Sequence, residues 1–322
     1  MNTFTRLLTY TLISLSAYLQ AAAPLFLASD PWPPFTGNVG APRVIIDLVE
    51  EALRRGDIEA STTIVEMSAL NSGLASGQFQ GSPALWKTDE RNEILLFSNP
   101  ILENKLVLLG RKGSDVSASS LLELKGKRVG IVDGYGYLAE LRDTGPAFIT
   151  GKNNQANFSA LLAGKLDYML VDELLLHYAM QNQLEKFKKT LVFGTQPIIT
   201  KPLYFALRKD TPNAAEIIET FNRELATMLQ DGSYQTILQL PWIRIDIDGD
   251  GKFELIYNGD QALSEVPLSH YQPFYHADEI EEEEERLYRV KGQLYDSWDD
   301  IPKSLKEPVD SSAGGVLYEF KF

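Results

Sequence analysis

Short apolar runs alternate with amphipathic segments between residues 24 and 240. Short runs predict strands, whereas apolar positions spaced three and four residues apart predict helices. Strands are predicted at 25–28, 62–67, 105–109, 128–132, 168–171 and 203–207, and helices at 44–55, 70–76, 121–124, 157–163, 174–183 and 214–229, with a last short helix after 232–234. Because strands separated by helices pair mostly in parallel, the pattern predicts an α/β fold.

The loops after the predicted strands hold most of the chemically distinctive residues. In a doubly wound sheet, ligands bind outside the carboxyl ends of the strands, so a site is expected there. These loops contain aromatic side chains, one arginine and several carboxylates, which suit a small ligand that carries both charges. The loops are Asp30–Phe35, Leu85–Arg91, Asp133–Tyr137 and Asp172–Glu173.

Seven short motifs follow one another in an order that resembles a known family. They are Asp30–Phe35, Asp47-Leu48, Gly77–Phe79, Thr88–Arg91 with Phe97–Pro100, Leu124–Gly130, Gly164–Asp167 with Asp172, and Asp231–Tyr234. Each motif alone is weak, but together the ordered set resembles the family 3 bacterial solute-binding proteins, the type II periplasmic binding proteins for amino acids.

The resemblance implies an α/β fold with two lobes, two crossover strands and a ligand cleft between the lobes. Lobe 1 would comprise residues 24–108 and 198–240, and lobe 2 residues 109–197. A small, β-rich acidic extension would follow at 241–322. Closure about hinges near 110–111 and 197–202 would bring both lobes onto the ligand.

Two charged residues are the principal ligand-binding candidates. The family's carboxylate-clamping arginine follows a threonine by three positions, and Arg91 after Thr88 has this spacing. A guanidinium matches a carboxylate with a planar fork of donors, although Arg91 also fits an ordinary charged turn. Asp172 matches the acidic residue of lobe 2 that receives the ligand ammonium. Its alternative role is the N-cap of the helix that follows.

Three aromatic residues are expected to line the same cleft. Trp32 lies where the family places a ring that stacks on the ligand side chain, although it could instead fill the core of lobe 1. Trp86 and Tyr135 are the other two candidates. Small hydroxyl residues are usual in their loops in the family, whereas this chain has Ala84, Trp86 and Gly136. This crowding favours a larger, flatter or less polar ligand, or a cleft that binds nothing.

The first residues have the layout of a secretory signal peptide. A short segment with Arg6 precedes an apolar run at 7–19 and the small residues 21–23. Since about 20 helical residues are needed to cross a bilayer, this run is too short for a typical transmembrane helix. A signal peptide at 1–23 predicts an exported, periplasmic protein, and a retained membrane anchor is the alternative.

Composition excludes several functions. The formal charge of −14 argues against nucleic acid or an acidic membrane as a partner. Without cysteine there is no disulfide, thiolate metal site or catalytic thiol. The count of three histidines argues against a multi-histidine zinc site. Residues 246–322 contain 19 acidic and 7 basic residues, a net charge of −12, so the extension differs in composition from the rest.

The extension begins with a calcium-loop pattern. Residues 246–254 place oxygens at loop positions 1, 3, 5 and 9 and a glycine at position 6, as in loops that bind a hard cation. Tyr257 occupies the position where an EF-hand has glutamate, and the flanking residues predict strands, so the loop is more similar to those of FG-GAP-type repeats. A hairpin with solvated carboxylates is the alternative to a structural Ca²⁺ site. The candidate ligands are Asp246, Asp248, Asp250, Lys252 and Glu254.

The remainder of the extension predicts a solvated acidic stretch at 278–285 and a hairpin at 289–298. The function expected for the whole chain is binding of an amino acid or related small carboxylate, with the closed form recognised by an ABC-type inner-membrane permease or a receptor. Alternatives are a periplasmic dehydratase-like enzyme on the same fold, and a sensor or scaffold with a vestigial cleft. No organic cofactor and no catalytic pair are expected.

Overall fold

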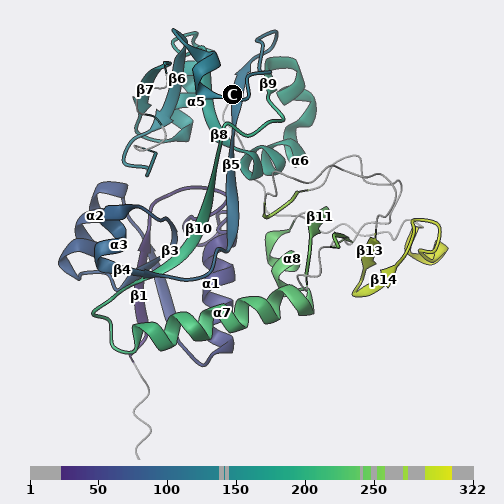
Figure 1. Ribbon diagram of the computed structural model, residues 1–322. Helices are drawn as coiled ribbons and strands as arrows, with labels where there is room; N and C mark the ends of the chain where they lie inside the picture. Colours follow the sequence, from purple (N-terminus) through teal and green to yellow (C-terminus); the bar gives the residue numbers. More distant parts are fainter. Residues whose placement is uncertain are drawn as a thin grey trace, which may run out of the picture.

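A ten-stranded mixed sheet extends through two lobes of the computed structural model (Figure 1). Its strand order is β2-β1-β3-β10-β5-β8-β6-β7, with β4 paired to β10 and β9 paired to β5. The structure describes residues 23–137, 141, 145–239, 242–247, 252–257, 271–274 and 287–306, and for 180–186 the backbone alone. The proposed signal peptide therefore lies outside the described residues except for Ala23.

Lobe 1 forms around strands β1 to β4. Strand β1 pairs in parallel with β2 and β3, as the alternation of strands and helices predicts. The strands are β1 (Leu25–Ser29), β2 (Ala60–Ile64), β3 (Gly81–Trp86) and β4 (Leu95–Phe97), and the helices are α1 (Val44–Arg55), α2 (Met67–Ser76), α3 (Asp89–Ile94), α7 (Ala214–Asp231) and α8 (Ser233–Leu238).

Lobe 2 repeats the same arrangement on a smaller scale. Strand β6 pairs in parallel with β7 and β8. The strands are β6 (Arg128–Val132), β7 (Ala147–Gly151), β8 (Tyr168–Asp172) and β9 (Leu191–Phe193), and the helices are α5 (Asn154–Leu162), α6 (Glu173–Thr190) and the 3₁₀-helix η1 (Leu121–Leu124).

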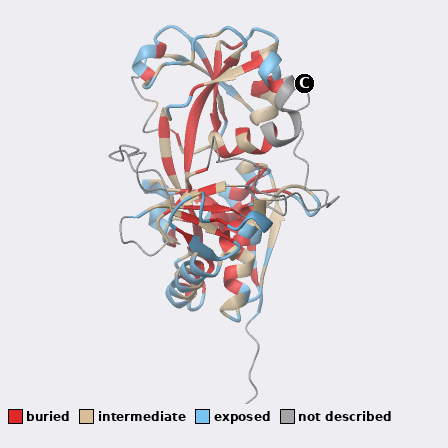
Figure 2. Ribbon diagram, turned by 90° about the vertical axis from the view of Figure 1, so that its right-hand side faces the viewer, coloured by how far each residue is buried: buried red, intermediate tan, exposed pale blue. Residues whose placement is uncertain are grey.

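Two ten-residue strands, β5 (Leu102–Arg111) and β10 (Ile199–Arg208), connect the lobes. They pair with each other in antiparallel fashion, from Leu102 opposite Leu203 to Leu106 opposite Ile199. Beyond Leu106, β5 pairs instead with β8 of lobe 2. Figure 2 shows buried residues along these strands, which explains why their sequences are mostly apolar. The expected pair of crossover strands is confirmed.

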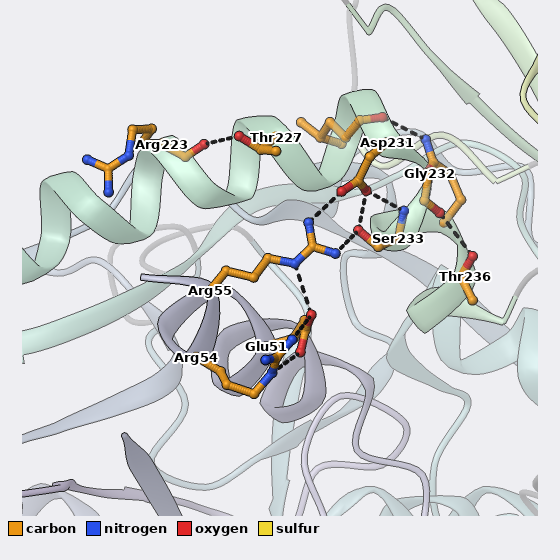
Figure 3. A network of polar contacts seen from close by, with 11 residues as sticks. Glu51, Arg54, Arg55, Arg223, Thr227, Asp231, Gly232, Ser233 and Thr236 are labelled. Atoms are coloured by element: carbon orange, nitrogen blue, oxygen red, sulfur yellow. Dashed lines mark hydrogen bonds and ion pairs between the residues drawn. The ribbon is translucent and has the colours of Figure 1, made fainter. Parts of the chain in front are cut away.

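Helix α1 illustrates how the amphipathic pattern builds lobe 1. Its apolar face, which includes Ile45, Leu48 and Leu53, is fully buried. Its polar face ends in Arg55, which donates hydrogen bonds to Glu51 Oε1 (2.9 Å), Asp231 Oδ2 (2.5 Å) and Ser233 Oγ (2.9 Å). Figure 3 shows this network joining α1 to the turn between α7 and α8.

The extension forms a separate four-stranded sheet. Its elements are β11 (Trp242–Ile245), β12 (Glu254–Tyr257), β13 (Leu287–Val290), β14 (Gln293–Tyr295) and the short helix α9 (Lys303–Lys306). Strands β13 and β14 form the expected hairpin, and its turn residues Lys291 and Gly292 both have positive φ, 49° and 81°. The β-rich character expected of the extension is confirmed in these elements.

The two faces of this small sheet pack in different places. Ile243, Ile245 and Ile256 join the hydrophobic core that continues through the two lobes. The opposite face forms its own cluster, in which Trp242 and Trp298 pack beside Tyr288. The extension is therefore attached to the binding fold by buried apolar surface as well as by the chain connection.

Candidate ligand cleft

A small cavity of about 20 Å³ lies where the two lobes meet. That volume accommodates little more than one water molecule. Tyr135 and Gly136 come from lobe 2, and the other lining residues come from lobe 1. The lining residues are Asp30, Trp32, Met67, Ala84, Leu85, Trp86, Arg91, Tyr135 and Gly136. Four of the five predicted ligand-binding residues, Arg91, Trp32, Trp86 and Tyr135, are thus brought together.

Arg91 is held in the cleft by short-range contacts of lobe 1. Thr88 is the N-cap of α3, and its Oγ1 accepts a hydrogen bond from Arg91 N (3.2 Å), which fixes the start of the helix. The guanidinium donates to Trp86 O (2.9 Å) and to Asn71 Oδ1 (3.4 Å). Burial lowers the pKa of Arg91, and the Asp30 charge opposes that shift.

Asp30 lines the cavity, although the sequence candidates did not include it individually. It lies directly after β1 and its exposed fraction is 4%. Burial raises its pKa to about 6, while a hydrogen bond from the Tyr135 side chain and the charge of Arg91 act in the opposite direction. The sequence did contain a signal for Asp30: it follows the carboxyl end of a buried strand and begins a loop already assigned to the cleft.

The aromatic candidates form one cluster across the lobe interface. The ring centroid of Trp32 lies 5.6 Å from that of Trp86 and 5.3 Å from that of Tyr135. Tyr135 and Tyr137 of lobe 2 lie 5.9 Å and 5.1 Å from Trp86. Centroid separations in this range are typical of favourable aromatic contacts. The contacts join aromatic rings of lobe 1 to aromatic rings of lobe 2.

Asp172 lies behind this cluster rather than along the cavity wall. Trp86 Nε1 donates to Asn104 Oδ1 (2.7 Å), and Asn104 Nδ2 donates to Asp172 Oδ2 (2.7 Å). The other carboxylate oxygen accepts from Leu174 N (2.8 Å), which is the N-cap role given above as the alternative. Burial raises the pKa of Asp172 to about 8. Its contact with a ligand ammonium stays a prediction.

The loop of lobe 2 that carries Tyr135 also contacts lobe 1 through its backbone. Lys201 Nζ donates to Gly136 O (2.5 Å) and lies 5.3 Å from the Trp86 ring centroid. A Cβ atom at Gly136 would lie 3.0 Å from Thr88 Cγ2, so a larger residue would need Thr88 to shift by a few tenths of an ångström. Glycine at this position allows the close approach of the two lobes.

The candidate calcium ligands are only partly within the described residues. Asp246 follows β11 and Glu254 begins β12, whereas Asp248 and Asp250 lie outside the described residues. Both carboxylate oxygens of Glu254 accept hydrogen bonds from Arg289, at 2.5 and 2.7 Å. Within the described part of the chain, no three His, Cys, Asp or Glu side chains gather as a metal-binding group.

Comparison with known proteins establishes the family. Residues 29–243 match the bacterial extracellular solute-binding proteins, family 3. The chain belongs to this family of two-lobed binding proteins. Among the described helices, none combines the length and the apolar character needed to cross a membrane.

Two curated relatives from Escherichia coli (strain K12) illustrate the similarity. The lysine/arginine/ornithine-binding periplasmic protein is 28% identical over 199 residues, which cover 59% of this chain and 74% of the relative. The ABC transporter arginine-binding protein 1 is 28% identical over 228 residues, which cover 66% of this chain and 87% of the relative.

Solved structures agree on the fold. The GluR0 ligand-binding core from Nostoc punctiforme in complex with L-glutamate has a TM-score of 0.56 and 21% identity, covering 66% of this chain and 97% of its own. A histidine kinase sensor domain with similarity to periplasmic binding proteins has a TM-score of 0.57 and 21% identity, covering 67% and 95%. At these identities the similarity concerns the fold alone.

Proposed function

We propose that the protein binds an amino acid that has a cationic side chain, in the cleft between its lobes. The observation that carries this proposal is the pairing of Arg91 and Asp30 on one aromatic-walled cavity. The Arg91 guanidinium binds the ligand carboxylate, since it offers planar donors in a desolvated setting. The Asp30 carboxylate binds the cationic end.

The aromatic walls support a cation as the second group. Trp32, Trp86 and Tyr135 line the same cavity as Asp30, and a cation gains energy over such ring faces. The names of the two curated relatives refer to lysine, arginine and ornithine, which carry a cationic side chain and an α-carboxylate. This ligand class therefore agrees with the chemistry of Arg91 and Asp30.

Binding requires the lobes to separate first. A cavity of about 20 Å³ cannot contain an amino acid, so the ligand must enter an open form and displace Tyr135 from Asp30. The apparent affinity is then the intrinsic affinity multiplied by the fraction of molecules that are open. The proposed hinges lie where the crossover strands pass between the lobes, near Leu106 of β5 and near 197–202 at the start of β10. The hinge expected near 110–111 lies inside lobe 2 instead, where Gly110 pairs with Tyr168 of β8.

A sensor or scaffold is the second candidate, and the small cavity favours it. Aromatic side chains of the two lobes contact each other beside this cavity, as expected for a vestigial cleft. Such a protein would pass on a signal through its surface rather than deliver a solute to a permease. We do not propose an enzyme, since the relatives described above are binding proteins by name.

Isothermal titration of the mature protein with arginine, lysine, ornithine, glutamate and glutamine tests the proposal. Binding of basic amino acids that is lost in Arg91→Ala is the expected result. Arg223→Ala is the matched control, because Arg223 is an exposed arginine of α7 that pairs with Glu224. Absence of binding across the whole panel would overturn the proposal and favour the scaffold.

We also propose export to the periplasm, with the closed form recognised by an ABC permease or by a receptor. The support is the signal-peptide pattern at 1–23 and the periplasmic relatives. A structural Ca²⁺ in the loop that begins at Asp246 is a further proposal. Only the sequence pattern supports it, and the ion pair between Glu254 and Arg289 counts against Glu254 as a ligand.

A further inference from the structure

A short segment of the extension lies inside the binding fold. Tyr271 has an exposed fraction of 1% and is one of the largest fully buried side chains among the described residues. Its backbone pairs with β11, since Tyr271 N donates to Trp242 O (3.1 Å) and Tyr271 O accepts from Arg244 N (2.9 Å). The segment 271–274 is therefore attached to the small sheet of the extension.

The same segment is attached to a crossover strand. Glu103 N, near the start of β5, donates to Pro273 O at 2.7 Å. At this position β5 has β10 on one side, with Glu103 opposite Pro202. Pairing of β5 with β8 of lobe 2 begins only at Leu106. Pro273 thus covers the edge of β5 next to the point where that strand enters lobe 2.

The Tyr271 ring extends this attachment to lobe 2. Lys105 Nζ, from β5, lies 5.4 Å from the ring centroid. The imidazole of His177, from helix α6 of lobe 2, lies 5.8 Å from the ring at an interplanar angle of 72°. Glu173 joins both neighbours, with Oε2 at 3.5 Å from Lys105 Nζ and Oε1 at 3.8 Å from His177 Nε2.

Lobe 1 completes the surroundings of Tyr271. The Tyr178 hydroxyl of α6 donates to Leu238 O at the end of α8, which links the lobes directly. Burial raises the pKa of Tyr271 well above its ordinary value, and Asp172, Tyr234, Glu173 and Tyr178 are close enough to add to the shift. Tyr234 belongs to α8 and Tyr178 to α6, so Tyr271 lies near both lobes.

We propose that the extension is a brace between the lobes, with Tyr271 as its anchor. The extension is held by β5 and packs on α6, so separation of lobe 2 from lobe 1 must break the contact between Tyr271 and His177. Packing that exists only in the closed form shifts the population toward that form. The brace opposes cleft opening whatever the cleft binds, so this proposal does not depend on the proposed ligand.

Distance measurements between the lobes test the brace without a ligand. The sequence contains no cysteine, so Glu93→Cys in lobe 1 and Lys152→Cys in lobe 2, both at exposed positions, allow specific spin labelling of the full mature chain. In a Tyr271→Ala background we expect a longer-distance population, with the open-to-closed ratio raised about tenfold, which corresponds to about 1.4 kcal/mol. An unchanged distance distribution would overturn the proposal.

Three further variants separate a brace from general destabilisation. Tyr295→Ala removes a buried tyrosine from the extension's own cluster and should leave the distances unchanged. Tyr271→Phe should also keep the closed distances, because no described residue hydrogen-bonds the Tyr271 hydroxyl. His177→Ala should open the lobes from the other side of the contact. If Tyr271→Ala does not fold, the interlobe distances of His177→Ala test the proposal in its place. If Tyr295→Ala opens the lobes as far as Tyr271→Ala does, the brace is contradicted.

Discussion

The side chain of Tyr135 in lobe 2 hydrogen-bonds the Asp30 carboxyl in lobe 1. The Tyr135 ring lies 5.3 Å from Trp32 and 5.9 Å from Trp86, so the chain's own phenol lies beside the carboxylate proposed to bind the ligand's cationic end. The Tyr135 hydroxyl and the cationic end of the proposed ligand therefore compete for the same carboxylate. This competition determines what substitutions in the cleft should do.

Tyr135→Phe should strengthen the binding of basic amino acids. The substitution keeps the ring but removes the hydroxyl that competes for Asp30. A hydrogen bond to a charged group contributes about 1.5–3 kcal/mol, so we expect the dissociation constant to fall about tenfold or more, as measured by isothermal titration. Ligands without a cationic side chain should show a smaller change.

Tyr137→Phe is the matched control for this substitution. Tyr137 lies in the same loop and packs 5.1 Å from Trp86, but its side chain is not a hydrogen-bond partner of Asp30. Its ligand affinity should remain close to that of the original protein. Weaker binding in Tyr135→Phe would mean that the hydroxyl contacts the ligand instead of competing with it.

Arg91→Lys should weaken ligand binding although the charge is retained. Lysine cannot offer the planar fork that matches a carboxylate, and it loses the fixed contacts with Trp86 O and Asn71. We expect the dissociation constant to rise about hundredfold, equivalent to about 2.7 kcal/mol, in the same titration. Arg208→Lys is the control, because Arg208 also donates to backbone carbonyls but lies away from the cavity.

The sequence predicted the alternation of strands and helices but missed the strand that positions the site. Residues Gly81–Trp86 form β3, which is buried along its whole length between β1 and β10. Glycine, serine and proline in this segment favour a turn by local propensity, and there is no alternation of polar and apolar residues to indicate a strand. Burial between two neighbouring strands, a tertiary effect, outweighed the local preference.

Tertiary packing also limited the prediction of the two charged ligand-binding residues, Arg91 and Asp172. Motif order selected Arg91 as a candidate, and Arg91 lines the cavity. Asp172 was selected by the same reasoning, yet Trp86 and Asn104 lie between its carboxylate and the cavity. Whether a large indole fills the space between two lobes depends on how closely the lobes approach. One chain's sequence does not specify that distance.

Stability should decrease as the pH rises from about 4 to about 8. Burial raises the pKa of Asp172 from 3.8 to about 8 and that of Asp30 to about 6. Across these intervals the unfolded chain has released protons that the folded protein retains, so ionisation favours unfolding. For each proton that the folded protein retains, the free energy of unfolding falls by up to about 1.4 kcal/mol per pH unit. Between pH 6 and 8, Asp172 contributes more of this decrease than Asp30 does.

Urea unfolding of Asp172→Asn between pH 5 and 9 checks this assignment. The variant should be less stable at low pH, because Asn104 loses a carboxyl partner, but its stability should depend less on pH between 6 and 8. Asp167→Asn is the control, since hydrogen bonds from Arg128 lower the pKa of Asp167 to about 2 and it does not titrate in this interval. A full slope that persists in Asp172→Asn would contradict the prediction.

Calcium should stabilise the protein through the loop that begins at Asp246. If the dissociation constant is about 1 mM, within the range of extracellular modules, 10 mM calcium adds about 1.4 kcal/mol to the free energy of unfolding. Asp246→Asn and Asp248→Asn should each abolish the rise in melting temperature, whereas Asp299→Asn, at an exposed position of the same extension, should retain it. Glu254→Gln should also retain it, because Arg289 already engages both oxygens of Glu254. A calcium response that survives Asp246→Asn and Asp248→Asn would assign the effect to another part of the chain.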